Sequence, residues 1–166
     1  MKETTNRKSL FDSLHQQYFP MVMQMCLGYM KGDTELAKDM AQDVFINTWK
    51  ALDGFKQQSS YKTWIYRITV NTCLLHIRKS KNEGRTEIND ALQHVPDESG
   101  DLKESQHQAL YKAIGTLPEL DRLIIMLMLE ELEYDEIATI TGISAVNLRV
   151  KIHRIKKKMR ELLNQE

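Results

Sequence analysis

Cysteine and long hydrophobic runs are scarce in this chain of 166 residues, and their scarcity excludes several classes of protein. Cys26 and Cys73 stand alone, with no CxxC pair and no partner at ligand-like spacing, so the sequence predicts neither a disulfide framework nor a zinc site. No stretch approaches the ~20 apolar residues of a membrane span. No apolar signal core follows the charged N-terminus. We therefore expect a cytoplasmic protein.

Groupings of residues that support catalysis are also lacking. The five histidines show no i, i+4 pair that would suggest a metal site, and no Ser or Cys nucleophile has a recognisable base. We expect no catalytic residue, no bound metal and no cofactor. The sequence therefore favours a protein that is not an enzyme.

Strand patterns and internal repeats are missing as well, because nearly every periodic segment has helical spacing. Pro20 either interrupts the first helix or opens a new one at its first turn. The expected fold class is all-α. Helices are expected over residues 10–18, 21–30, 34–49, 61–79 and 120–129, and over two further segments after residue 134.

Residues 81–107 separate two helical parts of the chain. This segment has no sustained period, contains Gly84, Pro96 and Gly100, and carries the acidic run 97–101, as is typical of a linker. We therefore expect two small helical domains, residues 1–80 and 108–166, joined by a flexible linker over residues 81–107.

Charge of one sign is not in excess, since 23 basic residues balance 23 acidic ones. The balance conceals a segregation: residues 91–136 hold 3 basic and 11 acidic side chains, whereas residues 137–166 hold 7 basic and 2 acidic ones. Phosphate attraction acts locally, because it is screened beyond ~10 Å at ordinary salt. The neutral total is therefore compatible with a nucleic-acid partner.

The C-terminal segment has the pattern of a helix-turn-helix whose second helix is basic. Residues 135–138 open a short helix, residues 141–143 make the turn, and Ser144 caps the next helix. Leu148, Ile152 and Ile155 fall on one stripe of that helix, and its cations lie on both flanks. The pattern favours DNA binding over the alternative of a terminal amphipathic helix with a solvated basic face.

Residues 53–79 mix aromatic and cationic side chains. Aromatic rings stack on unpaired bases and cations follow phosphates, so the mixture suits single-stranded DNA. Tyr61 and Trp64 also fit a structural role, and Tyr61 is expected in the core with Ile65. Lys62, Arg67 and Asn71 are the stronger predictions for DNA contact.

Three motifs in order resemble extracytoplasmic-function (ECF) sigma factors of bacterial RNA polymerase. They are residues 37–45 with Trp49, residues 59–68 with Asn71, and residues 117–118 with 134–138. The resemblance covers nearly the whole chain. It implies an alternative sigma factor that binds core RNA polymerase and directs promoter-specific initiation.

The resemblance also implies partners and residue roles. The partners are core RNA polymerase, through its beta-prime clamp helices and beta flap, promoter DNA, and an anti-sigma factor. The acidic and polar face of Asp39, Gln42 and Asp43 would bind the clamp helices. The minus-ten element would contact Lys56, Ser59, Ser60, Lys62, Trp64, Arg67 and Asn71. The minus-thirty-five element would contact Ser144, Asn147, Arg149, Lys151, Arg154, Lys157 and Lys158.

Two places depart from the family pattern. Glu131 stands where a small residue is common, and Glu133 stands where Ser or Thr commonly caps the helix, so the helix is expected to begin loosely or to be capped by Asp135. Val146 and Val150 stand where small or polar residues are frequent, which leaves the promoter preference open.

Two other functions fit parts of the sequence. One is a helix-turn-helix regulator that binds its operator without polymerase. The other is a helical adaptor whose basic end binds an acidic protein.

Overall fold

The computed structural model describes residues 2–83 and 102–165, with side chains described over residues 4–83 and 106–165. Over these ranges the secondary structure is helical and contains no strand, which confirms the predicted all-α class. The elements are α1 (Lys2–Tyr29), α2 (Thr34–Ala51), the short 3-10 helix η1 (Leu52–Gly54), α3 (Tyr61–Asn82), α4 (Leu102–Gly115), α5 (Glu119–Leu129), α6 (Tyr134–Thr141) and α7 (Ala145–Leu163).

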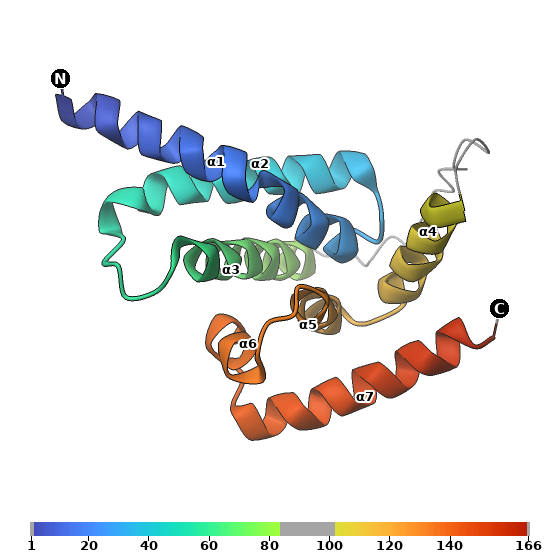
Figure 1. Ribbon diagram of the computed structural model, residues 1–166. Coiled ribbons are helices and arrows are strands. Elements are labelled where there is room, and N and C mark those ends of the chain that lie inside the picture. The colour runs from blue at the N-terminus through green and yellow to red at the C-terminus, as the bar shows by residue number, and fades with distance from the viewer. Residues whose placement is uncertain (1, 84–101, 166) are drawn as a thin grey trace.

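Helices α1, α2 and α3 form the first unit, in which each helix packs on the other two (Figure 1). Apolar residues at helical spacing face the centre, so that Val22, Val44 and Ile65 are fully buried. The side chains of Asp33 and Ser60 begin α2 and α3 by accepting hydrogen bonds from the backbone N–H groups of Leu36 and Thr63. These caps fix where each helix starts.

Pro20 lies inside α1, which continues from Lys2 to Tyr29. The prediction that Pro20 ends one helix or opens another is therefore wrong. Proline lacks the N–H that would bond one turn back, but the turns on either side of it bury Leu14, Val22 and Met25. Packing on both sides maintains a helix that local propensity alone would interrupt.

Helices α4 to α7 form the second unit, with the very apolar α5 in contact with α4, α6 and α7. Residues 81–82 and 102–107, which the sequence assigned to the linker, belong to the ends of α3 and α4. Glu83 caps the C-terminal end of α3. The rest of the predicted linker, residues 84–101, lies outside the described residues. Helix α4 is held by Ala113 and Ile114, which are buried in the core.

The two units pack directly on each other, with α5 against α1 and α6 against α3 (Figure 1). Gly28 of α1 lies so close to Met126 of α5 that any larger side chain at residue 28 would collide with the methionine. The buried side chains of both units form one continuous core. Helix α7 lies on the far side of the molecule from α2 (Figure 1).

Candidate functional site

The outer face of α2 presents an acidic and polar surface. Asp39, Gln42 and Asp43 are all exposed, while Met40 and Val44 of the same helix are buried. Because residues three and four positions apart share one helix face, the structure brings the three predicted side chains together. The surface can accept hydrogen bonds and ion pairs from a basic partner.

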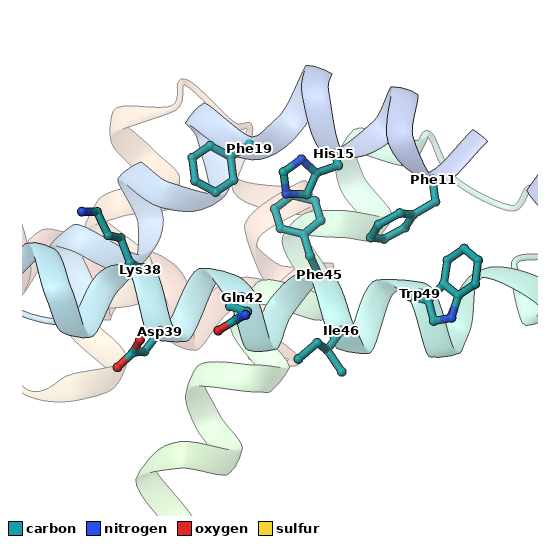
Figure 2. A pocket seen from close by; sticks show the side chains of 9 residues that line it. All are labelled: Phe11, His15, Phe19, Lys38, Asp39, Gln42, Phe45, Ile46 and Trp49. Atoms are coloured by element: carbon teal, nitrogen blue, oxygen red, sulfur yellow. The ribbon is translucent and has the colours of Figure 1, made fainter. Parts of the chain in front are cut away.

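An apolar groove between α1 and α2, which was not predicted from the sequence, borders this acidic face. Phe11, His15 and Phe19 of α1 are spaced one turn apart and point toward Phe45 of α2 (Figure 2). The centroid of the His15 ring lies 4.4 Å from that of Phe45. The i, i+4, i+8 spacing of these rings was the signal available in the sequence.

The groove has a volume of about 560 Å³ and is lined partly by residues of the acidic face. Asp39 and Gln42 both contribute to its wall, as does the exposed Ile46. The two features therefore form one surface, in which the Asp39 carboxylate and the Lys38 ammonium group lie beside an apolar hollow. Such a surface suits a partner helix that carries both basic and apolar side chains.

An aromatic cluster supports the loop that precedes α3. The Phe55 ring stacks on Tyr61 with centroids 4.5 Å apart and contacts Trp64 at 4.7 Å. Trp64 is half-buried in this cluster, so part of its ring surface is already covered by the protein. The cluster holds the loop, which carries Lys56, Ser59 and Ser60, against the start of α3.

The predicted minus-ten residues do not all share one surface. Trp64, Arg67 and Asn71 follow one side of α3, whereas Lys62 is about 180° from Asn71 around the helix. Lys56, Lys62, Arg67 and Asn71 are exposed, and Ser59 is half-buried. The Ser60 hydroxyl accepts the Thr63 N–H at 3.1 Å, which gives Ser60 a structural role.

The turn between α6 and α7 has helix-turn-helix geometry. Gly142 ends α6 in the left-handed conformation with φ of 74°, and the Ser144 hydroxyl accepts the Asn147 N–H at the start of α7. At the start of α6, the Glu136 carboxylate accepts the backbone N–H of Glu133 at 3.0 Å. The prediction that α6 begins loosely or is capped by Asp135 is therefore wrong. Glu133 is the N-cap, and Glu136, three residues later, reaches back to it in a capping box.

Glu131 occupies a backbone conformation that favours glycine. Its φ is 60°, and a side chain there is strained against the following carbonyl group. This explains why a small residue suits the position. The strain lies at the junction between α5 and α6, where the chain turns toward the helix-turn-helix.

Most of the predicted minus-thirty-five residues lie in solvent along α7. Asn147, Arg149, Arg154, Lys157 and Lys158 are exposed, as is the capping Ser144. Lys151 differs, because its Nζ lies 2.8 Å from Oδ1 of Asp121 on α5 and its side chain is half-buried. The ion pair ties Lys151 to the protein and leaves it less available to an external phosphate.

Two exposed valines on the same helix were not among the predicted contacts. Val146 is 74% exposed and Val150 is 49% exposed, near the N-terminal end of α7. The sequence signal for them was their departure from the family pattern. Their place on the helix indicates that they face outward with the cations.

Comparison with known proteins agrees with this arrangement. Residues 14–83 match the Sigma-70 region 2 family, and residues 107–159 match the family described as Sigma-70, region 4. The ECF RNA polymerase sigma-E factor of Escherichia coli is 32% identical over an alignment of 132 positions that covers 72% of this chain and 69% of the relative. The chain belongs to the ECF family of RNA polymerase sigma factors. The predicted function of an alternative sigma factor that directs transcription is thereby confirmed.

Other relatives of the sigma factor extend the match. The RNA polymerase sigma-H factor of Pseudomonas aeruginosa is 28% identical over 163 residues, covering 90% of this chain and 84% of the relative. The fold resembles that of the sigma factor RpoE of Bartonella quintana, solved in complex with the anti-sigma factor NepR, with a TM-score of 0.76 and 23% identity over 93% of this chain and 96% of that one. CnrH, solved with the cytosolic domain of CnrY, matches with a TM-score of 0.67 and 20% identity over 96% of this chain and 90% of that one.

Burial raises the pKa of titratable side chains inside the sigma factor. Burial and the neighbouring Glu130 carboxylate raise the pKa of Tyr66, whose hydroxyl donates a hydrogen bond to Glu130 at 3.0 Å. A hydrogen bond with Cys26, together with burial, raises the pKa of the Cys73 thiol well above its usual range.

Within residues 4–83 and 106–165, no group of three or more His, Cys, Asp or Glu side chains could hold a metal ion. None of the described helices is long and apolar enough to cross a membrane.

Proposed function

We propose that this sigma factor divides its work between two faces on different helical units. The face of Asp39, Gln42 and Asp43 binds the beta-prime clamp helices of core polymerase, and the outward face of α7 binds the minus-thirty-five element. The observation that carries this proposal is the placement of an acidic face on α2 and a cationic face on α7, both exposed, on opposite sides of the molecule. Each face has the charge that its partner requires.

The minus-ten element is bound by the loop before α3 and by one side of that helix. Arg67 and Asn71 are exposed in line with Trp64, so they can follow a single strand whose unpaired base rests near the aromatic cluster. Lys56, Ser59 and Ser60 in the loop, and Lys62 in the first turn of α3, contact the sugar-phosphate backbone. Ser60 also keeps its role as the cap of α3.

In the minus-thirty-five element, the N-terminal part of α7 approaches base edges and the later cations hold phosphates. Ser144, Asn147, Arg149 and Arg154 belong to the first group. Lys157 and Lys158 supply electrostatic attraction. Lys151 contributes less than Arg149, because its ammonium group is paired with Asp121.

The domain boundaries follow from these roles. The unit that ends with α3 binds core polymerase and minus-ten DNA, the unit that begins with α4 binds the upstream element and the beta flap, and the residues between Asn82 and Leu102 link the two units. An anti-sigma factor regulates the protein in the cytoplasm, as the solved complexes of CnrH and RpoE suggest by analogy. Catalysis belongs to the polymerase, so the sigma factor itself uses no cofactor.

Affinity for core polymerase tests the role of the α2 face. Replacing Asp39→Ala together with Asp43→Ala removes two carboxylates, so we expect the dissociation constant for core enzyme to rise about tenfold. Fluorescence anisotropy of labelled full-length protein titrated with core polymerase measures it.

Asp12→Ala provides the matched control, because Asp12 is an exposed carboxylate on α1 that does not line the groove. It should bind as tightly as the wild type. Equal affinity of the double variant and the wild type would remove the α2 face from the interface.

A further inference from the structure

In the N-terminal part of α7, the side chains that point directly away from the rest of the protein are apolar. We call the line that they follow along the helix its outermost line. Leu148, Ile152 and Ile155 are buried against the second unit. At about 100° per residue, Val146 and Val150 lie on the side opposite these three, about 40° from each other. Their exposures of 74% and 49% agree with that geometry.

These valines contribute little to folding. Valine is a weaker helix former than alanine or the long polar residues, and an exposed valine gains little from burial. Single exposed apolar residues are common on protein surfaces. Two of them one turn apart, at the centre of an otherwise cationic face, are better explained by a ligand that covers them.

Polar and cationic side chains flank the two valines on both sides. Arg149 lies on one side of the valines, and Asn147 and Arg154 lie on the other, all exposed. When a helix lies in the major groove, its outermost line faces the base edges and its flanks face the two phosphate backbones. The valines therefore meet bases, while the flanking side chains are placed to reach phosphates and the outer base edges.

Valine offers no hydrogen-bonding group, so it reads a base through apolar contact alone. The apolar group that a base pair displays in the major groove is the C5-methyl of thymine. We propose that Val146 and Val150 recognise thymine methyl groups in the minus-thirty-five element. This inference rests on the proposed role of α7 and specifies which bases it reads.

The spacing of the valines limits where the thymines lie. Four residues of helix rise about 6 Å, and consecutive bases on a strand are about 3.4 Å apart. The two thymines are therefore separated by about two base-pair steps, on either strand. An upstream element composed only of G·C pairs would contradict the inference at once.

Replacement of thymine by deoxyuridine tests the contact one methyl group at a time. Transcription of fragmented genomic DNA by core polymerase with the full-length protein identifies promoters, and each thymine of a shared upstream element is then replaced singly. We expect the affinity of the wild-type holoenzyme to fall about three- to fivefold at two positions, since each removes one buried methyl. Val146→Ala should abolish the difference between thymine and deoxyuridine at one position, and Val150→Ala at the other.

Two control variants separate recognition from folding. Leu163→Ala removes an exposed apolar side chain from the C-terminal end of α7, where it is 43% exposed, and should leave both differences intact. Val146→Ile keeps the apolar contact and should retain discrimination. Alanine favours helix more than valine does, so the alanine variants should unfold at a temperature no lower than that of the wild type.

The outcomes distinguish this inference from the proposed function. Promoter-specific transcripts with no effect of deoxyuridine, or with an effect that persists in both alanine variants, would overturn valine recognition and leave the sigma factor's role intact. Absence of promoter-specific transcripts would overturn the proposed function and the inference with it.

Discussion

Arg122 joins the two helical units through a single buried side chain. Its Nε donates to the carbonyl oxygen of Tyr29 at 3.0 Å, and a terminal nitrogen donates to that of Leu117 at 2.8 Å. The guanidinium also lies over the Tyr29 ring at 5.4 Å. The sequence did not indicate this role, because an arginine within an apolar helix normally faces solvent.

Arg122→Ala should lower the free energy of unfolding by about 2–4 kcal/mol, since two buried carbonyl groups lose their donors. Urea denaturation followed by circular dichroism measures the change. Arg160→Ala, at an exposed residue of α7, should change it by less than about 0.5 kcal/mol. Equal effects of the two variants would show that the buried hydrogen bonds contribute no stability.

The hydrogen bond between Tyr66 and Glu130, which joins the two units, makes the free energy of unfolding depend on pH. Because burial and Glu130 raise its pKa, the folded state holds the phenol proton more tightly than the unfolded state. This contribution is complete below the unfolded pKa of about 10 and is lost as the pH rises toward the folded pKa. Between about pH 9 and 11, the wild type should therefore lose stability more steeply than Tyr66→Phe.

Urea denaturation at several pH values gives the free energy of unfolding of the wild type and of Tyr66→Phe, and hence how steeply each falls with pH. Tyr134→Phe keeps the contact between Tyr66 and Glu130, so its slope should follow the wild type. Identical slopes for the wild type and Tyr66→Phe would show that the phenol does not titrate differently on folding.

Most individual elements could be predicted from the sequence. Apolar residues at helical spacing and the caps at Ser60 and Ser144 determine α3 and α7, so their starts were close to those observed. Pro20 misled the prediction because tertiary packing on both sides overrides its local effect. Helix α4 as a whole was not predicted, because its first half, residues 102–107, shows no clear apolar period.

Side-chain roles within an element were harder to predict than the element itself. The acidic face of α2 follows from spacing alone, and the structure bears out its exposure. The pairing of Lys151 with Asp121 depends on how α7 packs on α5, which the local sequence does not specify. The groove between α1 and α2 likewise depends on two helices that are distant in sequence.

Arg149→Ala should reduce transcription from promoters that need the upstream element by about five- to tenfold, because it removes an exposed cation from the proposed DNA-binding face of α7. Lys151→Ala should reduce it less, because that ammonium is already paired. Multi-round transcription with saturating core polymerase measures both effects. A larger loss for Lys151→Ala would show that the ion pair opens when DNA binds, and equal loss of core binding in either variant would contradict a role limited to DNA.

At the scale of the whole molecule, two units were predictable but their mutual packing was not. Gly28 against Met126 and Tyr66 against Glu130 join residues far apart in sequence, and only the shapes of the two units determine such contacts. Charge segregation was visible in the sequence, and the structure places the acidic face and the cationic helix on opposite sides (Figure 1). If the two faces have the roles proposed for them, this separation lets polymerase and upstream DNA be bound at the same time.

Mapping of RNA 5′ ends tests the central claim most directly. Core polymerase transcribes fragmented genomic DNA with and without the full-length protein. A sigma factor that contacts promoters through two units should produce new starts that share two upstream elements at a constant spacing. No new starts, together with sequence-specific DNA binding in the absence of polymerase, would contradict the sigma-factor role and favour a helix-turn-helix regulator.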